Sequence, residues 1–303
     1  MHVFVTGATG FIGGSVAVRL VEAGHTVSGL TRDEGRAGKL TALGIEPVFG
    51  TLDDSGLLAA RARAADAVVN AADSDHRGAV EALISGLAGS GKPFLHTSGS
   101  SVVGDDARGE VSEAVFTEEI HDPGSGWRPE ADKAPRVEID RLVLAAADSG
   151  IRSTVLCNTL IYGHGLGPGR DSVQIPALVR QARSSGVARH VGPGRNIWSN
   201  VHIADVADLY ALALDRSPAG SFHFVENGEE SFAAITTAIA ETLGVAGPEP
   251  WDIESAIDAW GYEPAVYALG SNSRVRATRP RPVLGWTPTH ASVTDWIRGE
   301  LTA

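Results

Sequence analysis

The stretch that decides the fold is VFVTGATGFIGG, residues 3–14. A short apolar strand runs directly into a glycine turn, and residues with helical apolar spacing follow it as far as Ala23. Gly7 permits the tight turn, Gly10 lets the backbone approach a pyrophosphate, and Gly13 lets the helix pack closely against the strand. The free N–H groups at the helix start and the helix dipole favour negative charge there. The stretch therefore predicts a dinucleotide site with contacts from Gly7, Thr9, Gly10, Phe11, Ile12 and Gly13.

Apolar segments and helical segments alternate through the first half of the chain. The apolar runs predict further strands at residues 26–31, 46–49, 67–70, 93–97 and 153–158. The segments between them predict helices at residues 35–43, 57–63, 77–90 and 134–149. Parallel strands joined by helices form right-handed crossovers. The pattern therefore predicts an α/β fold, a Rossmann-type doubly wound parallel sheet.

Two irregular segments interrupt this alternation. One is the polar stretch 104–133, and the other is the glycine-rich stretch GHGLGPG that follows Tyr162. Long irregular loops in a compact domain are usually lids or binding loops. They begin at the carboxyl ends of the strands, where ligands of open α/β sheets bind.

The domain organisation follows from the place where the alternation ends. We expect a dinucleotide-binding Rossmann core over residues 1–157, with its sheet completed by about residues 196–225. Residues 158–195 and 226–303 are then expected to form a smaller substrate-binding part.

Bulk composition narrows the classes of function. The 303 residues are 43% hydrophobic and carry a formal net charge of −12, so the chain can bury a sizeable core. The acidic balance argues against nucleic-acid binding, because phosphate contacts require clustered Lys and Arg. Cys157, the only cysteine, lies among apolar residues and favours a buried thiol in a reducing compartment. No apolar run is long enough to span a bilayer, so we expect a cytoplasmic protein without membrane contacts, and we expect no metal.

Six segments carry a family resemblance: TGATGFIG (6–13), VVNAA (68–72), LHTSGSSVVG (95–104), LIYG (160–163), VHIADVA (201–207) and LGWTP (284–288). Together they resemble the short-chain dehydrogenase/reductase superfamily, in its extended or atypical branch, the NAD-dependent epimerase/dehydratase group. The resemblance covers nearly the whole chain. It implies a nicotinamide dinucleotide, a small-molecule substrate, and a homodimer formed through helices that flank the sheet, although no segment here specifies the dimer.

The resemblance assigns further positions to the cofactor. It implies that Ala71, after the fourth strand, lines the adenosine side and that Tyr162 lies beside the nicotinamide. Asp53 or Asp54 is expected near the adenine, although the family more often carries its aspartate at the position of Thr51.

Arg32 bears on the choice between NADP and NAD. It follows the second strand, where NAD-specific sites usually place an acidic residue for the ribose hydroxyls. A guanidinium there matches the 2′-phosphate of NADP, and Arg36 lies close enough to help. Asp33 and Glu34 keep NAD open, since either carboxylate could reach a ribose. The predicted cofactor is therefore NADP, with NAD as the alternative.

The residue pair that normally carries the chemistry of this family is absent. The resemblance implies a tyrosine and, four residues later, a lysine that lowers the pKa of the phenol. This chain has no tyrosine before Tyr162. Counting back from Asp140 places Arg136 at the lysine position and Asp132 at the tyrosine position.

A second register is also open. Counting back from Glu138 instead places Ala134 at the lysine position, and Lys133 fits neither register. In the first register, Arg136 could hold the nicotinamide ribose but could not release a proton. Asp132 would be ionised unless burial raised its pKa. An exposed salt-bridge cluster at the start of a helix is the alternative interpretation of these charges.

Histidine is a candidate for proton donation because its pKa lies near neutrality. His164 is favoured over His121 and His202, since it lies in the glycine-rich loop that is expected to face the substrate. A surface histidine is the alternative.

Serines at the end of the fifth strand are candidates for substrate polarisation. A hydroxyl there can hydrogen-bond a carbonyl and prepare it for hydride attack. Ser98 and Ser100 are favoured together, because the serine position of the family falls on Gly99 between them. Turn formation is the alternative role for both.

Three functions remain open. The favoured hypothesis is an NADPH-dependent reductase of a small carbonyl or imine compound. A non-catalytic NADP-binding sensor, a different class of protein, would account for the missing tyrosine and lysine. A sugar-nucleotide epimerase or dehydratase is the third, and its diphosphate pocket could be formed by Arg170, Arg180, Arg183, Arg189 and Arg195.

Overall fold

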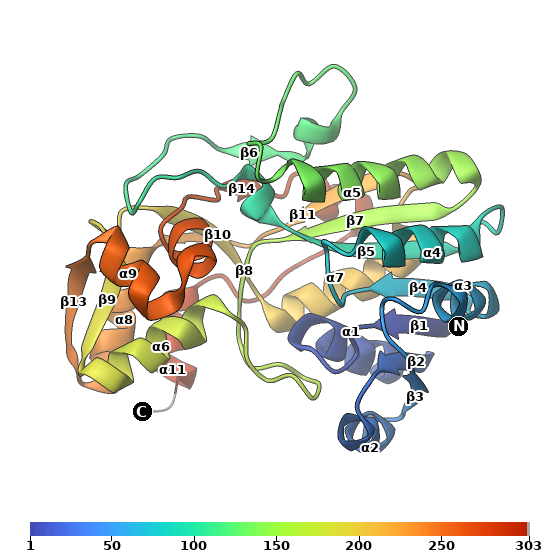
Figure 1. Cartoon of the computed structure of the whole chain (residues 1–303), viewed down its shortest axis with the longest axis horizontal. Helices are drawn as coiled ribbons and strands as arrows, with labels where there is room; N and C mark the ends of the chain where they lie inside the picture. Colours follow the sequence, from blue (N-terminus) through green and yellow to red (C-terminus); the bar gives the residue numbers. More distant parts are fainter. Residues whose placement is uncertain (302–303) are drawn as a thin grey trace.

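A large parallel sheet with helices on both faces dominates the structure, and a smaller α/β part lies beside it (Figure 1). The computed structural model describes residues 1–301. The large sheet has seven strands in the order β11-β7-β5-β4-β1-β2-β3. Their bounds are β1 (His2–Thr6), β2 (Thr26–Thr31), β3 (Ile45–Phe49), β4 (Ala67–Asn70), β5 (Pro93–Gly99), β7 (Arg152–Asn158) and β11 (Ser221–Val225). The order confirms the predicted doubly wound sheet, whose direction of winding reverses at β1.

Helices cover this sheet in two layers. On one side α1 packs beside α7, and on the other α3 packs beside α4 and α4 beside α5. The helices around the large sheet are α1 (Phe11–Glu22), α2 (Glu34–Ala42), α3 (Ser55–Ala64), α4 (Arg77–Leu87), α5 (Ala134–Ala145) and α7 (Ile203–Arg216). The predicted strands and helices are all present, and their ends are shifted by up to four residues.

Burial on both faces explains why the strands could be found in the sequence. Val3, Phe4 and Val5 of β1 have no exposed surface. Val3 pairs with Val27 on one side and with Ala67 on the other, so β1 lies in the interior of the sheet. A strand in this position has no polar face, and its sequence is a continuous apolar run.

The smaller part consists of short sheets and helices. Strands β8 (Leu160–Tyr162), β10 (Ile197–His202) and β12 (Glu229–Ser231) form one sheet, and β9 (Val187–Val191) pairs with β13 (Ala246–Trp251). A further pair joins β6 (Phe116–Thr117) to β14 (Val275–Arg276). The remaining helices are α6 (Gln174–Ser185), α8 (Phe232–Leu243), α9 (Ile253–Trp260), α10 (Pro280–Leu284) and α11 (Val293–Glu300).

Residues 196–225 complete the large sheet only in part. Strand β11 pairs with β7 at the sheet edge, as expected, whereas β10 pairs with β8 and β12 in the smaller part. The residues between them form helix α7, whose first turn is capped by the His202 side chain, which accepts a hydrogen bond from the Ala204 N–H.

Two hydrophobic clusters accompany the two parts. The first surrounds the large sheet, and the second lies among α6, α8, β9 and α11. Val275, Leu284 and Trp286 join the first cluster, although they come from the range assigned to the smaller part. The division at residue 157 stays a prediction.

Glu118 ties the irregular segment 104–133 to the rest of the fold. Its side chain is fully buried, and its carboxylate accepts hydrogen bonds from the Phe224 N–H (3.2 Å) and from the Thr278 N–H (3.1 Å) and hydroxyl (2.6 Å). Strand β11, the C-terminal segment and the long loop thus share one carboxylate.

Replacing Glu118 with Ala should lower the free energy of unfolding by roughly 3 kcal/mol, because buried donors on two segments lose their acceptor. Denaturant unfolding measures this loss. Glu119→Ala is the matched control, since that neighbouring side chain is exposed and should change stability by less than about 0.5 kcal/mol. Equal stability of the two variants would contradict the anchoring role of Glu118.

Candidate functional site

The first βα turn is built by close backbone packing. Gly7 has a φ of 71°, and a Cβ at this position would overlap the carbonyl oxygen of Ala71. A Cβ at Gly13 would overlap the carbonyl oxygen of Gly7. Helix α1 begins just beyond Gly10, so its first N–H groups have no acceptor within the helix. This turn fits the pyrophosphate of a dinucleotide, because the residue at the N-cap is Gly10 and no side chain accepts a capping hydrogen bond there.

A cavity of about 530 Å³ opens next to this turn, at the ends of β2 and β3. It brings together five of the predicted cofactor residues: Gly7, Thr9, Arg32, Arg36 and Asp53. Phe11, Ile12 and Gly13 follow in the first turn of α1. Ala71 contributes through its backbone, which packs on Gly7, and Ala72 lines the cavity.

Some of the charged side chains around this cavity already have hydrogen-bond partners. Asp33 caps α2 by accepting a hydrogen bond from the Arg36 N–H (3.2 Å), and Asp53 accepts one from His76 (3.1 Å). Among residues 1–301, no carboxylate lies within ion-pair distance of Arg32. Of the cations that line this cavity, Arg32 is therefore the one that has no acidic partner within residues 1–301.

The glycine-rich loop lies directly on the start of α1, a contact that the sequence did not predict. A Cβ at Gly169 would lie 2.6 Å from the Phe11 nitrogen, and one at Gly167 would lie 2.6 Å from the Gly14 carbonyl carbon. The Leu166 N–H also donates a hydrogen bond to the Ser15 hydroxyl (3.1 Å). The loop therefore forms a second wall of the dinucleotide turn.

A second cavity, of about 570 Å³, lies between the start of α5 and the smaller part. The polar and aromatic side chains that line it are Asp75, Ser101, Asp132, Lys133, Arg136, Gln174, Trp198, Glu263 and Tyr267. Asp132 and Arg136 were predicted from the sequence. Asp75, Ser101, Lys133 and Tyr267 were not assigned to the site, and only the order of the segments in space brings them together.

Arg136 is held at this cavity by two partners. Its guanidinium forms a two-pronged ion pair with Asp75 and donates a hydrogen bond to the Ser101 hydroxyl (3.0 Å). The hydrogen bonds from Arg136 keep the pKa of Asp75 below its ordinary value. A Cβ at Gly99 would lie 3.7 Å from the guanidinium, so the serine position of the family adjoins Arg136.

Ser98 and Ser100, the predicted polarising residues, point into the protein. The Ser98 hydroxyl donates to a carboxylate oxygen of Asp140 (2.9 Å), and Ser100 bonds with Ser273 (2.7 Å). Both serines are buried, and neither lines the cavity. The 3₁₀ turn that follows β5 brings Ser101 to the surface of the cavity instead.

Behind these serines lies a buried polar cluster. Burial raises the pKa of Asp140 to about 7 and lowers the pKa of His96 to about 4. His96 contacts the side chain of Asn70 (3.0 Å), which in turn accepts a hydrogen bond from Thr6 (2.6 Å). The cluster links the end of β1 to the middle of α5, because His96 lies 4.0 Å from the carboxylate of Asp140.

The histidine and tyrosine candidates lie elsewhere. His164 lines a separate cavity of about 290 Å³ and packs against Trp296, with ring centroids 5.3 Å apart. His121 packs on Phe222 (4.2 Å), and burial lowers its pKa to about 4. Tyr162 is buried in the second hydrophobic cluster. The structure therefore does not bring His164 or Tyr162 to the second cavity.

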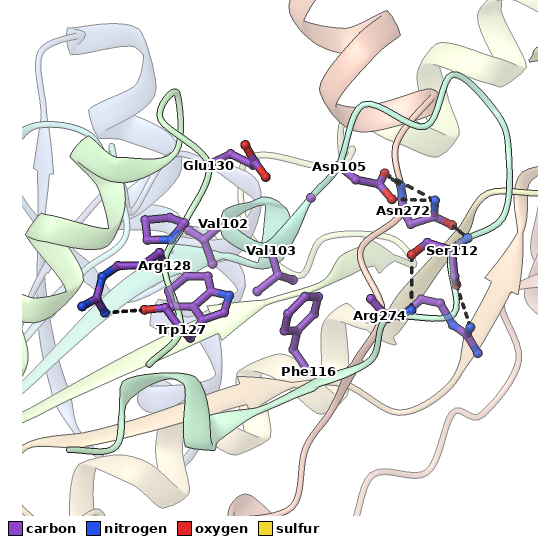
Figure 2. A pocket seen from close by; sticks show the side chains of 13 residues that line it. Val102, Val103, Asp105, Ser112, Phe116, Trp127, Arg128, Glu130, Asn272 and Arg274 are labelled. Carbon is purple, nitrogen blue, oxygen red and sulfur yellow. Dashed lines mark hydrogen bonds between the residues drawn. The ribbon is translucent and has the colours of Figure 1, made fainter. Parts of the chain in front are cut away.

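Figure 2 shows a smaller cavity of about 150 Å³ formed by the segment 104–133 and the start of β14. The side chains of Val103, Phe116 and Trp127 form its apolar side. On the other side, the Asn272 side chain donates a hydrogen bond to Asp105 (3.0 Å). Val102 lines this cavity and the second one, so the two adjoin.

With this geometry established, comparisons with known proteins identify the family. Residues 3–224 match the model of the NAD dependent epimerase/dehydratase family. The chain belongs to this family. It is 33% identical to the oxidase ucsJ of an Acremonium species, over 94% of this chain and 92% of that protein. It is 28% identical to a 4-hydroxy-2-methyl-3-oxo-4-farnesyl-3,4-dihydroquinoline-1-oxide ketoreductase of Stigmatella aurantiaca, over 98% and 96% of the two chains.

The fold comparison agrees. The structure superimposes on dTDP-glucose 4,6-dehydratase of Bacillus anthracis, solved in complex with NAD, with a TM-score of 0.75 at 16% identity, over 98% of this chain and 94% of that one. The predicted family and fold are thereby confirmed, as is the expectation of an NAD(P)-dependent oxidoreductase at the level of the family.

No helix within residues 1–301 is both long and apolar enough to cross a membrane. No group of three or more His, Cys, Asp or Glu side chains is arranged there to hold a metal ion.

Replacing Gly169 with Ala should weaken NAD(P)H binding roughly tenfold, about 1.4 kcal/mol, because the added methyl group displaces the backbone that presents the N–H groups of α1. Isothermal titration measures the affinity. Gly38→Ala is the control, since a Cβ at that helical position meets no atom within 4 Å. Unchanged affinity of the Gly169 variant would contradict the second-wall role of the loop.

Replacing Asp140 with Asn should change how stability depends on pH. In the wild type, the folded pKa of about 7 lies above the unfolded value, so Asp140 contributes stability at low pH that is lost as the pH rises toward 7. The variant lacks this loss. Its free energy of unfolding relative to the wild type should therefore increase from pH 5 to pH 7, by at most about 1.4 kcal/mol per pH unit.

Denaturant titrations at several pH values test this expectation. Asp148→Asn, on an exposed residue, is the control and should run parallel to the wild type. A constant difference between the Asp140 variant and the wild type across this range would show that Asp140 is ionised in the folded protein.

Proposed function

We propose that the chain is an NADPH-dependent reductase of a small carbonyl or imine compound. The observation that carries the proposal is the Arg136–Ser101 pair on the wall of the second cavity. When bound, the nicotinamide supplies a hydride. Arg136, a permanent cation with five donors, suits the ribose hydroxyls. The Ser101 hydroxyl accepts a hydrogen bond from Arg136, so its own proton is free to polarise a carbonyl oxygen.

The names of two relatives support a redox reaction. The Stigmatella relative is named a ketoreductase and the Acremonium relative an oxidase, and both match almost the whole chain. Both names describe an oxidation or a reduction, and neither describes the rearrangement of a sugar.

The preference for NADP rests on Arg32. This guanidinium lines the cavity beside the dinucleotide turn and has no acidic partner there, which suits a 2′-phosphate. Asp33, which would compete for a ribose in an NAD site, is occupied as the cap of α2. These features favour NADP over the NAD that the family description names.

The sugar-nucleotide alternative finds little support. Arg189 pairs with Glu249, Arg195 pairs with Glu110, and Arg170 donates to the Gly165 carbonyl. Arg180 and Arg183 line the cavity that contains His164. The five arginines therefore do not gather around one diphosphate. A cytoplasmic location and a homodimer stay predictions.

Replacing Arg32 with Ala should weaken NADPH binding at least tenfold and NADH binding less than threefold, because only NADPH carries the 2′-phosphate. Isothermal titration with both cofactors measures this, with exposed Lys39→Ala as a control at the other end of α2. Equal losses for the two cofactors would contradict the assignment of Arg32.

Turnover is tested by following NADPH oxidation at 340 nm over a panel of ketones, aldehydes and imines. Oxidation that depends on the substrate supports the reductase. Tight NADPH binding without oxidation across the whole panel would reject it in favour of the sensor.

A further inference from the structure

A tyrosine and a lysine do meet in the second cavity, although they come from distant parts of the chain. Tyr267 lies in the short helical segment Pro264–Leu269 of the smaller part, and Lys133 immediately precedes α5. The Lys133 ammonium nitrogen lies 3.4 Å from the centroid of the Tyr267 ring. Both residues line the second cavity, where the Tyr267 side chain is half-buried and that of Lys133 is 14% exposed.

Asp132 completes this cluster. Its carboxylate lies 2.8 Å from the Lys133 ammonium nitrogen, and hydrogen bonds from Lys133 and Tyr267 lower its pKa. Asp132 lies in the turn just before α5 and lines the second cavity together with Arg136, whose guanidinium we assign to the cofactor ribose. The phenol of Tyr267 therefore reaches the same wall of the cavity as Arg136.

Reduction of a carbonyl requires a proton as well as a hydride, and few groups of this cavity can give one. Arg136 does not deprotonate. Asp75 and Asp132 have lowered pKa values because they accept hydrogen bonds from Arg136 and Lys133, respectively, so both are ionised. Glu263 is exposed to solvent, where a carboxyl group has no proton to give at neutral pH.

Ser101 is already assigned to hydrogen-bond the carbonyl, so among the described residues that line the cavity two groups with a transferable proton remain, Tyr267 and Lys133. Lys133 forms an ion pair with Asp132 and a cation–π contact with the Tyr267 ring. The hydrogen bond with Tyr262 raises the pKa of Tyr267 to about 12, so the phenol keeps its proton at neutral pH until a stronger base forms beside it. An alkoxide is such a base.

We propose that Tyr267 is the proton donor of this site and that Lys133 is the cation that stabilises its phenolate. This inference rests on the reductase function proposed above. As hydride adds to the carbonyl carbon, the C=O π bond breaks, the Tyr267 O–H bond breaks, and a new O–H bond forms on the substrate oxygen. The ammonium over the ring offsets the repulsion between the phenolate and Asp132. Tyr267 then recovers a proton from water, so the reaction consumes one NADPH and one proton for each alcohol formed.

Tyr267→Phe is the first test, because it removes the hydroxyl and leaves the ring beneath Lys133. With the best substrate of the panel, kcat should fall at least 100-fold, within the range expected for loss of a general acid, while the Kd for NADPH changes less than twofold. Asp258→Asn is the control. It changes an exposed side chain on α9, outside the second cavity, and kcat should change less than threefold.

Tyr267→His separates catalysis from structure. Imidazole has a transferable proton, so the kcat of this variant should be at least tenfold higher than that of Tyr267→Phe. Its kcat should also fall as the pH rises above about 7, because the imidazole then loses its proton. A merely structural role would give similar losses in both variants and no new pH dependence.

The outcomes distinguish the two proposals. If the wild type binds NADPH but reduces no compound of the panel, the reductase function fails and the role of Tyr267 fails with it. If the wild type turns over and Tyr267→Phe retains more than a third of its kcat, only the role of Tyr267 is overturned.

Discussion

The structure depends on close backbone-to-backbone packing at glycine positions near the end of β1. Gly7 packs on the carbonyl of Ala71, Gly13 packs on the carbonyl of Gly7, and Gly169 packs on the first turn of α1. Three loops from separate parts of the chain therefore meet without intervening side chains. The start of α1 keeps a fixed position because of this contact, and its N–H groups are presented in one direction.

From this point the candidate site extends to two cavities that differ in charge. Beside the turn, Arg32 has no acidic partner, which suits an additional phosphate. In the second cavity both cations are matched by carboxylates, Arg136 by Asp75 and Lys133 by Asp132. A cavity with internally paired charges suits an uncharged substrate better than a diphosphate, because each cation that residues 1–301 place there already faces a carboxylate.

The sequence was a good guide where a single segment determines its own surroundings. The strands of the large sheet were found because both of their faces are buried, and the dinucleotide turn was found because its glycines are required by local geometry. The direction of the side chains after β5 did not follow from the sequence, because the 3₁₀ turn at 100–103 buries Ser98 and Ser100 and places Ser101 at the cavity. A role of Ser98 or Ser100 in polarising the substrate stays a prediction. Lys133 fitted neither register of the family motif, and its contact with Tyr267 depends on how two distant segments pack.

The glycine-rich loop also has a consequence for attempts to alter selectivity. Gly165, Gly167 and Gly169 each pack so tightly that a methyl group would meet backbone or a neighbouring ring, so evolution cannot diversify these positions without moving the loop. Differences in substrate selectivity must therefore come from positions whose side chains line the cavities, chiefly the segment 104–133 and the turn around Tyr267. Mutant libraries aimed at new substrates belong on those two segments, and the glycine wall should be kept as an invariant frame.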